Sequence, residues 1–566
     1  MAPRVSVQPS LETVQQVLSS SKGSPKAPNL VPLCASIPAD LLTPSLAYLK
    51  VSAQSKSKQS FLFESAATTE TIGRYSFVGA DPRKVLKTGP GHGPECDPLP
   101  LLEEELSQFR VATIPDLILP PLTGGAIGYV GYDCVRYFEP KTARPMKDVL
   151  HLPEALFMLF NTIIAFDHFY QVIKVVTYLS VPPSSTPNPS TLSSAYNAAS
   201  ATLSATIATL LSPDIPLPPQ PPITPNQEYT SNIGQSGYEN HVKTLKRHIT
   251  RGNIIQAVPS QRFSRPTSLH PFNIYRHLRT VNPSPYLFYI DCGGAFQLVG
   301  ASPELLVKGE KGRIVTHPIA GTVKRGTSPE ADEALANELR NSLKDRAEHV
   351  MLVDLARNDV NRVCDPLSTR VDRLMVVEKF SHVQHLVSQV SGVLRKGKNR
   401  FDAFRSIFPA GTVSGAPKVR AMELIAELEG EKRGVYAGAV GYFGYVGVRF
   451  GGSNKAGSDG LGVDTEMVEA EGAMDTCIAL RTMLVKDGVA YLQAGGGVVF
   501  DSDPYEEWVE TMNKLGANMQ CIASAEERYA SVDDGGGEAD GGGLGDGGEG
   551  VGEGGVERAH VDMAAG

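Results

Sequence analysis

Two carboxylates late in the chain have a spacing that suits a metal ion. Glu507 and Glu510 lie three residues apart in the run from Tyr505 to Lys514, so a helix would place both on one face. Like charges at that spacing are mildly unfavourable unless a cation joins them. Magnesium fits this role, because it takes one or two protein carboxylates and fills its other positions with water and an anionic ligand. A surface helix whose carboxylates pair with lysines explains the run equally well.

A third carboxylate, Glu348, lies in the run from Arg346 to Asp359. The apolar residues at 350, 353, 355 and 356 suit a buried helix. Taken alone, Glu348 is better explained as a charged residue in a solvated helix start, since carboxylates are usually exposed. Glu348 becomes a candidate metal ligand only when it is considered together with Glu507 and Glu510.

Groups that could hold an anion lie just before the paired carboxylates. The stretch from Gln493 to Val499 is a strand pattern broken by Gly495, Gly496 and Gly497, whose amides could approach a carboxylate closely because no side chain intervenes. Arg481 could give the same anion a bidentate partner. A glycine bulge and a structural salt bridge are the alternative explanations.

Two short runs in the middle of the chain end apolar stretches with small or turn-forming residues. They are Gly300 to Glu304 and His317 to Thr322. We expect Glu304 and the pair Gly321 and Thr322 to lie near strand ends, where substrates are commonly bound.

The elements that must position these residues fall into two folded regions with loose ends. We expect a flexible N-terminus at 1–30, a strand-rich domain at 31–180, a Pro/Ser/Thr-rich linker with one helix at 181–236, a mixed domain at 237–524 with an insertion at 451–471, and a disordered Gly/acidic tail at 531–566. The expected strands are Phe61–Phe63, Arg74–Val78, Ala126–Val130 and Gln171–Val176, and the expected helices are Ser193–Leu211 and Tyr238–Arg251.

Composition excludes several classes of function. The net charge of −8 and scattered lysines and arginines disfavour a nucleic-acid binder. The seven cysteines form no C-x-x-C pair, which disfavours both a disulfide framework and a zinc site. The N-terminus lacks a signal pattern, and the most apolar stretch, Glu154–Phe166, is too short for a membrane span. We therefore expect a cytoplasmic protein that contacts no membrane.

Together these motifs resemble the chorismate-utilising enzymes, over about Gly252 to Asn518. The resemblance implies an α+β, two-domain fold with large antiparallel sheets sandwiched with helices. Residues 31–180 would form an N-terminal domain with a feedback site, and 237–524 the chorismate-binding catalytic domain. By matching position, the metal-binding residues would be Glu348, Glu510 and the neighbouring Glu507. The substrate-binding residues would be Gly321, Thr322, Tyr436, Arg481, Gly495, Gly496 and Gly497. The metal, Mg2+, would bridge to the ring carboxylate of chorismate.

Two positions separate the chemistries within this family. At Gln256, relatives that form isochorismate or salicylate carry a lysine that activates water. Because a glutamine amide does not titrate, water should not be the nucleophile and ammonia becomes the candidate. At Ala320, aminodeoxychorismate synthases carry a lysine that attacks the ring covalently. Alanine leaves direct attack by ammonia, the pattern of the family members that form anthranilate.

The resemblance implies a reaction in two stages. Glu304 would act as general acid on the departing C4 hydroxyl while ammonia adds at C2, which requires a raised pKa for its carboxyl. Loss of a proton and of pyruvate then gives anthranilate, the first committed step of tryptophan biosynthesis. His385 would handle the proton, although a histidine in an apolar run is more often a core residue, and Thr412 would lie nearby.

The source of ammonia points to a partner. None of the cysteines lies in the Gly-x-Cys-x-Gly type of elbow that a glutaminase uses, so we expect a separate glutaminase subunit in a hetero-oligomer. The use of free ammonia alone is the alternative.

A second site is expected for feedback inhibition by tryptophan. Phe61 to Ser65 resembles the family's Leu-Leu-Glu-Ser motif, and Asn282 to Leu287 resembles its partner segment. The implied tryptophan-binding residues are Glu64, Ser65, Arg74, Pro285, Tyr286, Leu287, Val440 and Tyr442. An ordinary strand and a proline turn are the simpler explanation of these runs.

Two other functions compete with the formation of anthranilate. Ala320 disfavours aminodeoxychorismate synthase component I. A non-catalytic regulatory homologue would be expected to lack at least one of Glu304, Glu348 and Glu510, and all three are present.

Overall fold

A computed structural model describes residues 6–21, 24, 26–65, 73–181, 188–379, 383–450 and 467–533. The expected tail from residue 534 onward, and 451–466 of the expected insertion, lie outside the described residues. Within the described part, no helix is both long enough and apolar enough to cross a membrane.

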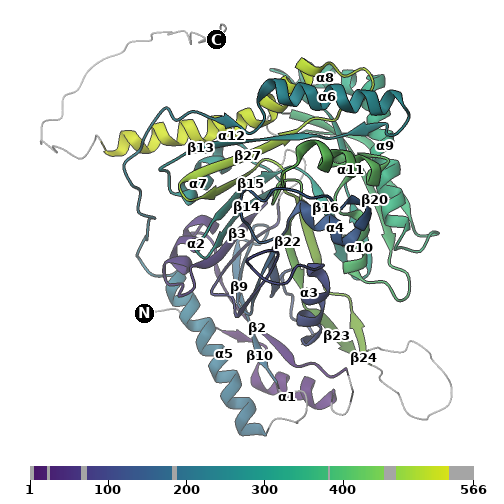
Figure 1. Ribbon diagram of the computed structural model, residues 1–566. Coiled ribbons are helices and arrows are strands. Elements are labelled where there is room, and N and C mark those ends of the chain that lie inside the picture. Colours follow the sequence, from purple (N-terminus) through teal and green to yellow (C-terminus); the bar gives the residue numbers. More distant parts are fainter. Residues whose placement is uncertain are drawn as a thin grey trace, which may run out of the picture.

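The larger of two main sheets joins strands from both halves of the chain (Figure 1). In spatial order its strands are β11 (Thr230–Ser231), β13 (Ser260–Pro266), β27 (Val489–Gly495), β26 (Thr482–Lys486), β15 (Gln297–Ser302), β14 (Tyr286–Cys292), β3 (Gln59–Glu64), β4 (Tyr75–Ala80), β9 (Ile163–Asp167), β10 (Val172–Ser180), β2 (Leu30–Pro38), β6 (Arg110–Ala112), β23 (Val446–Phe450) and β24 (Met467–Ala470), with β1 (Val7–Gln8) beside β2. Its pairs are antiparallel except where β6 meets β2 and β23.

The second main sheet faces the first and is likewise shared. Its order is β18 (Ile319–Lys324), β20 (Val383–Val393), β17 (Arg313–Thr316), β16 (Leu305–Glu310), β25 (Met474–Ile478), β22 (Ala439–Gly444), β7 (Gly125–Val130), β8 (Ala155–Phe160) and β5 (Lys84–Thr88), with β19 (Arg370–Lys379) beside β20. A separate pair joins β12 (Gln256–Ala257) to β21 (Gly415–Ala416). The expected regions 31–180 and 237–524 therefore contribute strands to both main sheets.

Helices cover the outer faces of the two sheets (Figure 1). They are α1 (Leu11–Ser20), α2 (Pro44–Ala53), α3 (Pro98–Ser107), α4 (Val135–Phe138), α5 (Pro189–Leu210), α6 (Gly234–Thr250), α7 (Pro271–Val281), α8 (Pro329–Asn341), α9 (Leu343–Asn361), α10 (Arg400–Ile407), α11 (Lys418–Glu429) and α12 (Pro504–Asp533). The described residues also form 3-10 turns at Tyr132–Cys134, Pro140–Thr142 and Gly411–Val413.

Large apolar side chains fill the space between the two sheets. Phe61 and Phe288 of the first sheet pack in one cluster with Phe160 and Tyr129 of the second, and all four are at most 2% exposed. Alternate residues of each strand point into this layer, as the period of two in a strand requires. The α+β fold with large antiparallel sheets and covering helices is thus confirmed.

Most of the expected elements are confirmed, with two differences. The four expected strands lie in β3, β4, β7 and β10, and the two expected helices in α5 and α6. Residues expected to be flexible at the N-terminus include β1 and α1, whose Val14 and Leu18 are buried against the first sheet. Gly321 and Thr322 were expected at a strand end but lie within β18, because a bulge at Gly321 lets the strand continue.

Candidate active site

Glu304 lies in the short connection between β15 and β16, as expected for a residue near a strand end. Its side chain is buried, and the hydroxyl of Thr412 donates a 3.0 Å hydrogen bond to Oε1. Burial raises the pKa of this carboxyl to about 8, against the lowering effects of the Thr412 hydroxyl, the backbone N–H of Ile319 and the charge of Lys514. The carboxyl is therefore protonated near pH 7 and can act as an acid.

Gln256 and Glu348 meet in front of the glycine run. The Gln256 amide Nε2 donates a 2.9 Å hydrogen bond to Oε1 of Glu348, which lies on α9. Burial raises the pKa of Glu348, the Gln256 amide and Lys514 lower it, and the nearby carboxylate of Glu510 raises it further. A Cβ at Gly497 would come within 2.3 Å of the Gln256 amide nitrogen, so only glycine permits this approach.

The first turns of α12 hold the paired carboxylates. The Ser502 hydroxyl donates to Oε1 of buried Glu507 at 2.5 Å, while Oε2 has no hydrogen-bond partner among the described residues. Glu510 is about half exposed, and its carboxylate lies 2.7 Å from Nζ of Lys514, one turn further along the helix. Lys514 therefore supplies the cation that two like charges on one helix face require.

The glycine run ends β27 beside these carboxylates. The Gly496 N–H donates to the hydroxyl of buried Tyr238 at 3.0 Å, and Lys514 Nζ donates to the Gly495 carbonyl at 3.0 Å. Tyr436 is also buried here. Burial raises the pKa of its hydroxyl to about 12, against a lowering effect of the nearby Gly495 backbone.

Arg481 carries a positive charge that the described residues leave without a carboxylate partner. The residue precedes β26, which pairs with β27, and its carbonyl accepts a hydrogen bond from the N–H of Ala301. Burial lowers the pKa of its guanidinium. The φ of 46° is uncommon for a residue with a side chain. These features favour a role in anion binding over the alternative of a structural salt bridge.

His385 and Thr322 pair across β20 and β18. The Nδ1 of His385 lies 3.0 Å from the Thr322 hydroxyl and 3.1 Å from the Gly321 carbonyl. Burial lowers the pKa of the imidazole to about 4, and the nearby Arg481 charge adds to this effect. His385 is therefore neutral at pH 7 and suited to accept a proton. Ala320, next to Gly321 in the same strand, is buried and offers no nucleophile.

The carboxylates fit a magnesium ion that shares its coordination with a bound anion. Among the described residues no group of three or more His, Cys, Asp and Glu side chains converges to hold a metal alone. Glu348 and Glu510 are nevertheless close enough for the charge of one to raise the pKa of the other, and Glu507 Oε2 is buried beside them without a partner. An oxygen donor set of this kind suits magnesium, which relies on few protein ligands.

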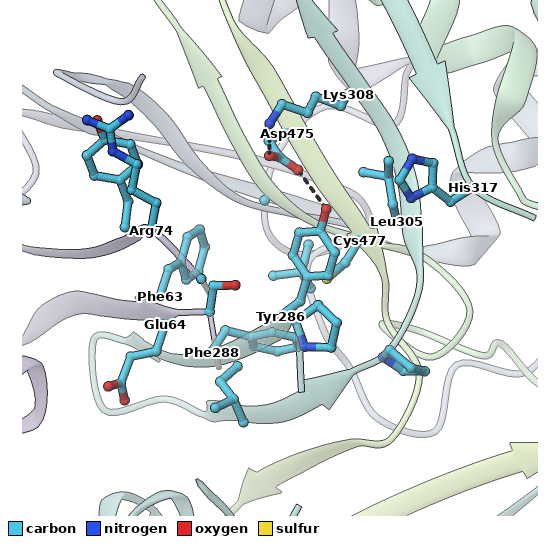
Figure 2. Close-up of a pocket in the computed structure, with 18 of the residues that line it drawn as sticks. Phe63, Glu64, Arg74, Tyr286, Phe288, Leu305, Lys308, His317, Asp475 and Cys477 are labelled. Carbon is cyan, nitrogen blue, oxygen red and sulfur yellow. Dashed lines mark hydrogen bonds and ion pairs between the residues drawn. The ribbon is translucent and has the colours of Figure 1, made fainter. Parts of the chain in front are cut away.

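The larger of two described cavities lies elsewhere, between the two sheets, with a volume of about 580 Å³. All eight residues expected to bind tryptophan contribute to its wall. Figure 2 shows Phe63 and Tyr286 beside the cavity, with Asp475 hydrogen-bonded to the Tyr286 hydroxyl and next to Lys308. The carboxylate of Glu64 is held outside it by the Tyr275 hydroxyl at 2.5 Å and Arg279 at 3.0 Å. Arg74 pairs with Asp167 at the rim and is about half exposed.

Two charged residues at these sites were given no role from the sequence, although pairing of the α12 carboxylates with lysines was one of the two explanations of that run. Lys514 lies four residues after Glu510, a helical spacing that could have identified it. Asp475 lines the cavity and accepts hydrogen bonds from the Tyr286 hydroxyl at 3.1 Å, with Lys308 Nζ 3.5 Å away. Nothing in the surrounding sequence distinguishes Asp475, because its position depends on the pairing of β25 with β16 and β22.

Comparisons with known proteins show the family to which the chain is related. The family model described as "chorismate binding enzyme" matches residues 58–449 and 466–520. Anthranilate synthase component 1 of Saccharomyces cerevisiae is 58% identical over 94% of this chain and 99% of its own length. A probable anthranilate synthase component 1 of Schizosaccharomyces pombe is 52% identical over 93% of this chain and 99% of its own. The crystal structure of anthranilate synthase component I from Streptococcus pneumoniae is 34% identical, covers 85% of this chain and 99% of its own, and superposes with a TM-score of 0.64.

Proposed function

The chain belongs to the family of chorismate-binding enzymes, and we propose that it is the subunit of an anthranilate synthase that converts chorismate and ammonia to anthranilate and pyruvate. The observation that carries this proposal is a sequence identity of 58% and 52%, over nearly the full length, with an anthranilate synthase component 1 and a probable anthranilate synthase component 1. In this role the chain would catalyse the first committed step of tryptophan biosynthesis.

The proposed chemistry begins at Glu304. Its protonated carboxyl donates a proton to the C4 hydroxyl of chorismate, which leaves as water while ammonia adds at C2. Thr412 orients the carboxyl through its hydrogen bond. Neutral His385 then accepts the C2 proton as pyruvate departs and the ring becomes aromatic. The opposite protonation states of Glu304 and His385 near pH 7 support this division into acid and base.

Substrate binding is assigned to the anion-binding groups around the end of β27. The Arg481 guanidinium and the amides of Gly495 to Gly497 would hold carboxylate groups of chorismate, with Tyr436, Gly321 and Thr322 beside the ring. The support for this assignment is a partly buried arginine that has no carboxylate partner among the described residues.

Two side chains favour ammonia as the nucleophile, because neither can activate water or attack the ring itself. Gln256 holds Glu348 through its amide, which does not titrate and so cannot activate water as a base. Ala320 leaves no amine for covalent attack. Aminodeoxychorismate synthase component I, the second candidate, would need that amine. A regulatory homologue without activity is disfavoured because Glu304, Glu348 and Glu510 are all retained.

Magnesium belongs to the proposal as the cofactor, with Glu348 and Glu510 as its ligands and Glu507 beside them. When bound, the ion would neutralise the negative charge of the substrate carboxylate in the site. Lys514, which pairs with Glu510 here, would have to share that carboxylate.

Ammonia is proposed to come from glutamine through a separate glutaminase subunit in a hetero-oligomer. The component number in the relatives' names supports a second component. The seven cysteines are free in the structure, and six of them are buried. A cytoplasmic location is part of the same proposal, because free thiols suit a reducing compartment.

Tryptophan is the proposed occupant of the cavity between the sheets, as a feedback inhibitor. Phe63, Phe77 and Leu287 give the cavity apolar walls for an indole ring, and Asp475 provides a carboxylate for an ammonium group. The agreement of all eight expected residues with one cavity supports this assignment.

Substitution of Ser65 tests the tryptophan site. Because a hydrogen bond to a charged group contributes about 1.5 to 3 kcal/mol, Ser65→Ala should raise the tryptophan concentration for half-inhibition by roughly tenfold or more. Ammonia-dependent anthranilate formation is measured against tryptophan, relative to each variant's own rate without it. The control is Ser57→Ala, an exposed serine before the same strand. An unchanged inhibition curve in Ser65→Ala would refute this placement of the inhibitor.

The pH dependence of the reaction tests the role of Glu304. The active form is the protonated carboxyl, so kcat/KM at constant free ammonia should be full below about pH 8 and should fall about tenfold per unit above it. Thr412→Val removes a hydrogen bond that lowers this pKa, and the falling limb should therefore move to higher pH. A rate that is flat through pH 8 to 9 would contradict the assignment.

The proposed activity itself is tested with the purified full chain, chorismate, magnesium and an ammonium salt. We expect the blue fluorescence of anthranilate to appear with time. The absence of fluorescence, with chorismate unconsumed, would rule out the proposed function.

A further inference from the structure

The inhibitor cavity and the candidate acid share a wall. Leu305 and His317 line the large cavity between the sheets, and both also line a small cavity of about 20 Å³ next to Glu304 and Thr412. The small cavity has room for about one water molecule. Figure 2 draws Leu305 and His317 together at the edge of the large cavity. Leu305 also follows Glu304 directly in the chain, so a displacement of one moves the other.

Ile319 borders the large cavity with its side chain and the surroundings of Glu304 with its backbone. Its side chain lines the large cavity, opposite Val387 on the neighbouring strand β20. Its backbone N–H belongs to the peptide that joins it to Pro318, which lines the small cavity beside Glu304, and this N–H lowers the pKa of the Glu304 carboxyl. A side chain can yield to a ligand only by rotation or by moving its backbone, and β-branched side chains are stiff about χ1. Pressure on Ile319 is therefore passed to the backbone that lies beside the carboxyl.

The same sheet face carries the candidate base. His385 lies two residues from Val387 in β20 and so points to the same side of the sheet. Because of the bulge at Gly321, whose φ is 65°, Thr322 lies on the same face of the sheet as Ile319 and pairs with His385 of the neighbouring strand. One pair of strands thus bears the cavity-lining pair Ile319 and Val387 and then the active-site pair Thr322 and His385.

We propose that Ile319 is a positioning residue that couples occupancy of the cavity between the sheets to the placement of the Glu304 carboxyl. The inference rests on the proposed function and names a structural route for its regulation. An occupant that displaces Ile319 withdraws or redirects the N–H from the carboxyl, and the acid is then misplaced for the C4 hydroxyl. Loss of a residue that couples the two sites should lower the maximal effect of the inhibitor. Loss of a residue that only contacts the inhibitor should lower its affinity.

The test separates these two quantities. In Ile319→Ala, tryptophan should still bind by calorimetry, but the activity that remains at saturating tryptophan should rise at least about fivefold over that of the parent, the lower end of usual allosteric coupling. Ile319→Val, which keeps the branched Cβ, should restore near-complete inhibition. The matched control is Phe77→Leu, an apolar truncation in the opposite sheet: it should raise the tryptophan concentration required but leave inhibition complete at saturation.

The outcomes distinguish the inference from its premise. Complete inhibition of Ile319→Ala at saturating tryptophan would overturn the coupling role, as would equal residual activity in Ile319→Ala and Phe77→Leu. A parent enzyme that forms anthranilate but binds no tryptophan would refute the cavity's role and the coupling, and leave the synthase reaction standing. A parent that forms no anthranilate would refute the proposed function.

Discussion

Replacement of Glu304 by glutamine should lower kcat for ammonia-dependent anthranilate formation by about 10²- to 10⁴-fold, the range that positioned acid catalysis contributes. The amide preserves the size of the side chain and can still accept from Thr412, but its N–H protons are not acidic enough to protonate the departing hydroxyl. Because the carboxyl is buried and its pKa is raised to about 8, the neutral amide replaces a group that is already neutral near pH 7, and the fold should be retained. The measurement is steady-state kinetics at constant free ammonia.

The matched control is Glu310→Gln at the far end of β16, the strand that begins directly after Glu304. Glu310 is about half exposed and lies 3.9 Å from Lys311, so its loss should leave kcat within about twofold of the parent. If Glu304→Gln, shown to be folded by circular dichroism, retained a similar rate, the role as acid would be contradicted.

Chelation of divalent metal should reduce the rate by roughly 10²- to 10³-fold, and added magnesium should restore it. Charge stabilisation by a bound metal is worth several kcal/mol, and about 1.4 kcal/mol corresponds to a factor of ten. Glu348→Gln should have an effect of similar size at any magnesium concentration used, because it removes a ligand that Gln256 orients and a negative charge beside Glu510. Magnesium affinity is measured in parallel by calorimetry with chorismate present.

Glu506→Gln is the control for the metal site. Glu506 lies on the same helical turn as Glu507 but is exposed, so its loss should change neither magnesium affinity nor rate. Full activity after exhaustive chelation, or equal effects of Glu348→Gln and Glu506→Gln, would exclude the proposed magnesium ligands.

Local sequence patterns were enough to predict the elements that carry the site. Strand-like runs punctuated by glycine and proline identified β3, β4, β7 and β10, and the helical spacing of Glu507 and Glu510 placed them on one face of α12. The resemblance to a known family then supplied the roles of residues far apart in sequence. Glu304, Gln256, Glu348 and Arg481 come from four separate segments of the chain, which no local pattern could have related to one another.

The remaining features depend on strand pairing, which a single sequence does not reveal. The bulge at Gly321 extends β18 past the expected strand end, and the interleaving of early and late strands gives both main sheets members from each expected domain. Asp475 and Ile319 gained their importance in the same way, since the cavity they line exists only where the two sheets face each other. Lys514 is different, because its spacing from Glu510 was visible in the sequence.

The most direct test of the central claim is the identity and ratio of the products formed from chorismate and ammonium by the purified chain with magnesium. Separation of the reaction mixture by liquid chromatography with mass detection should give anthranilate and pyruvate in equal amounts, because no lysine stands at position 320 to divert the ring. Accumulation of aminodeoxychorismate without pyruvate, or of isochorismate from attack by water, would contradict the account.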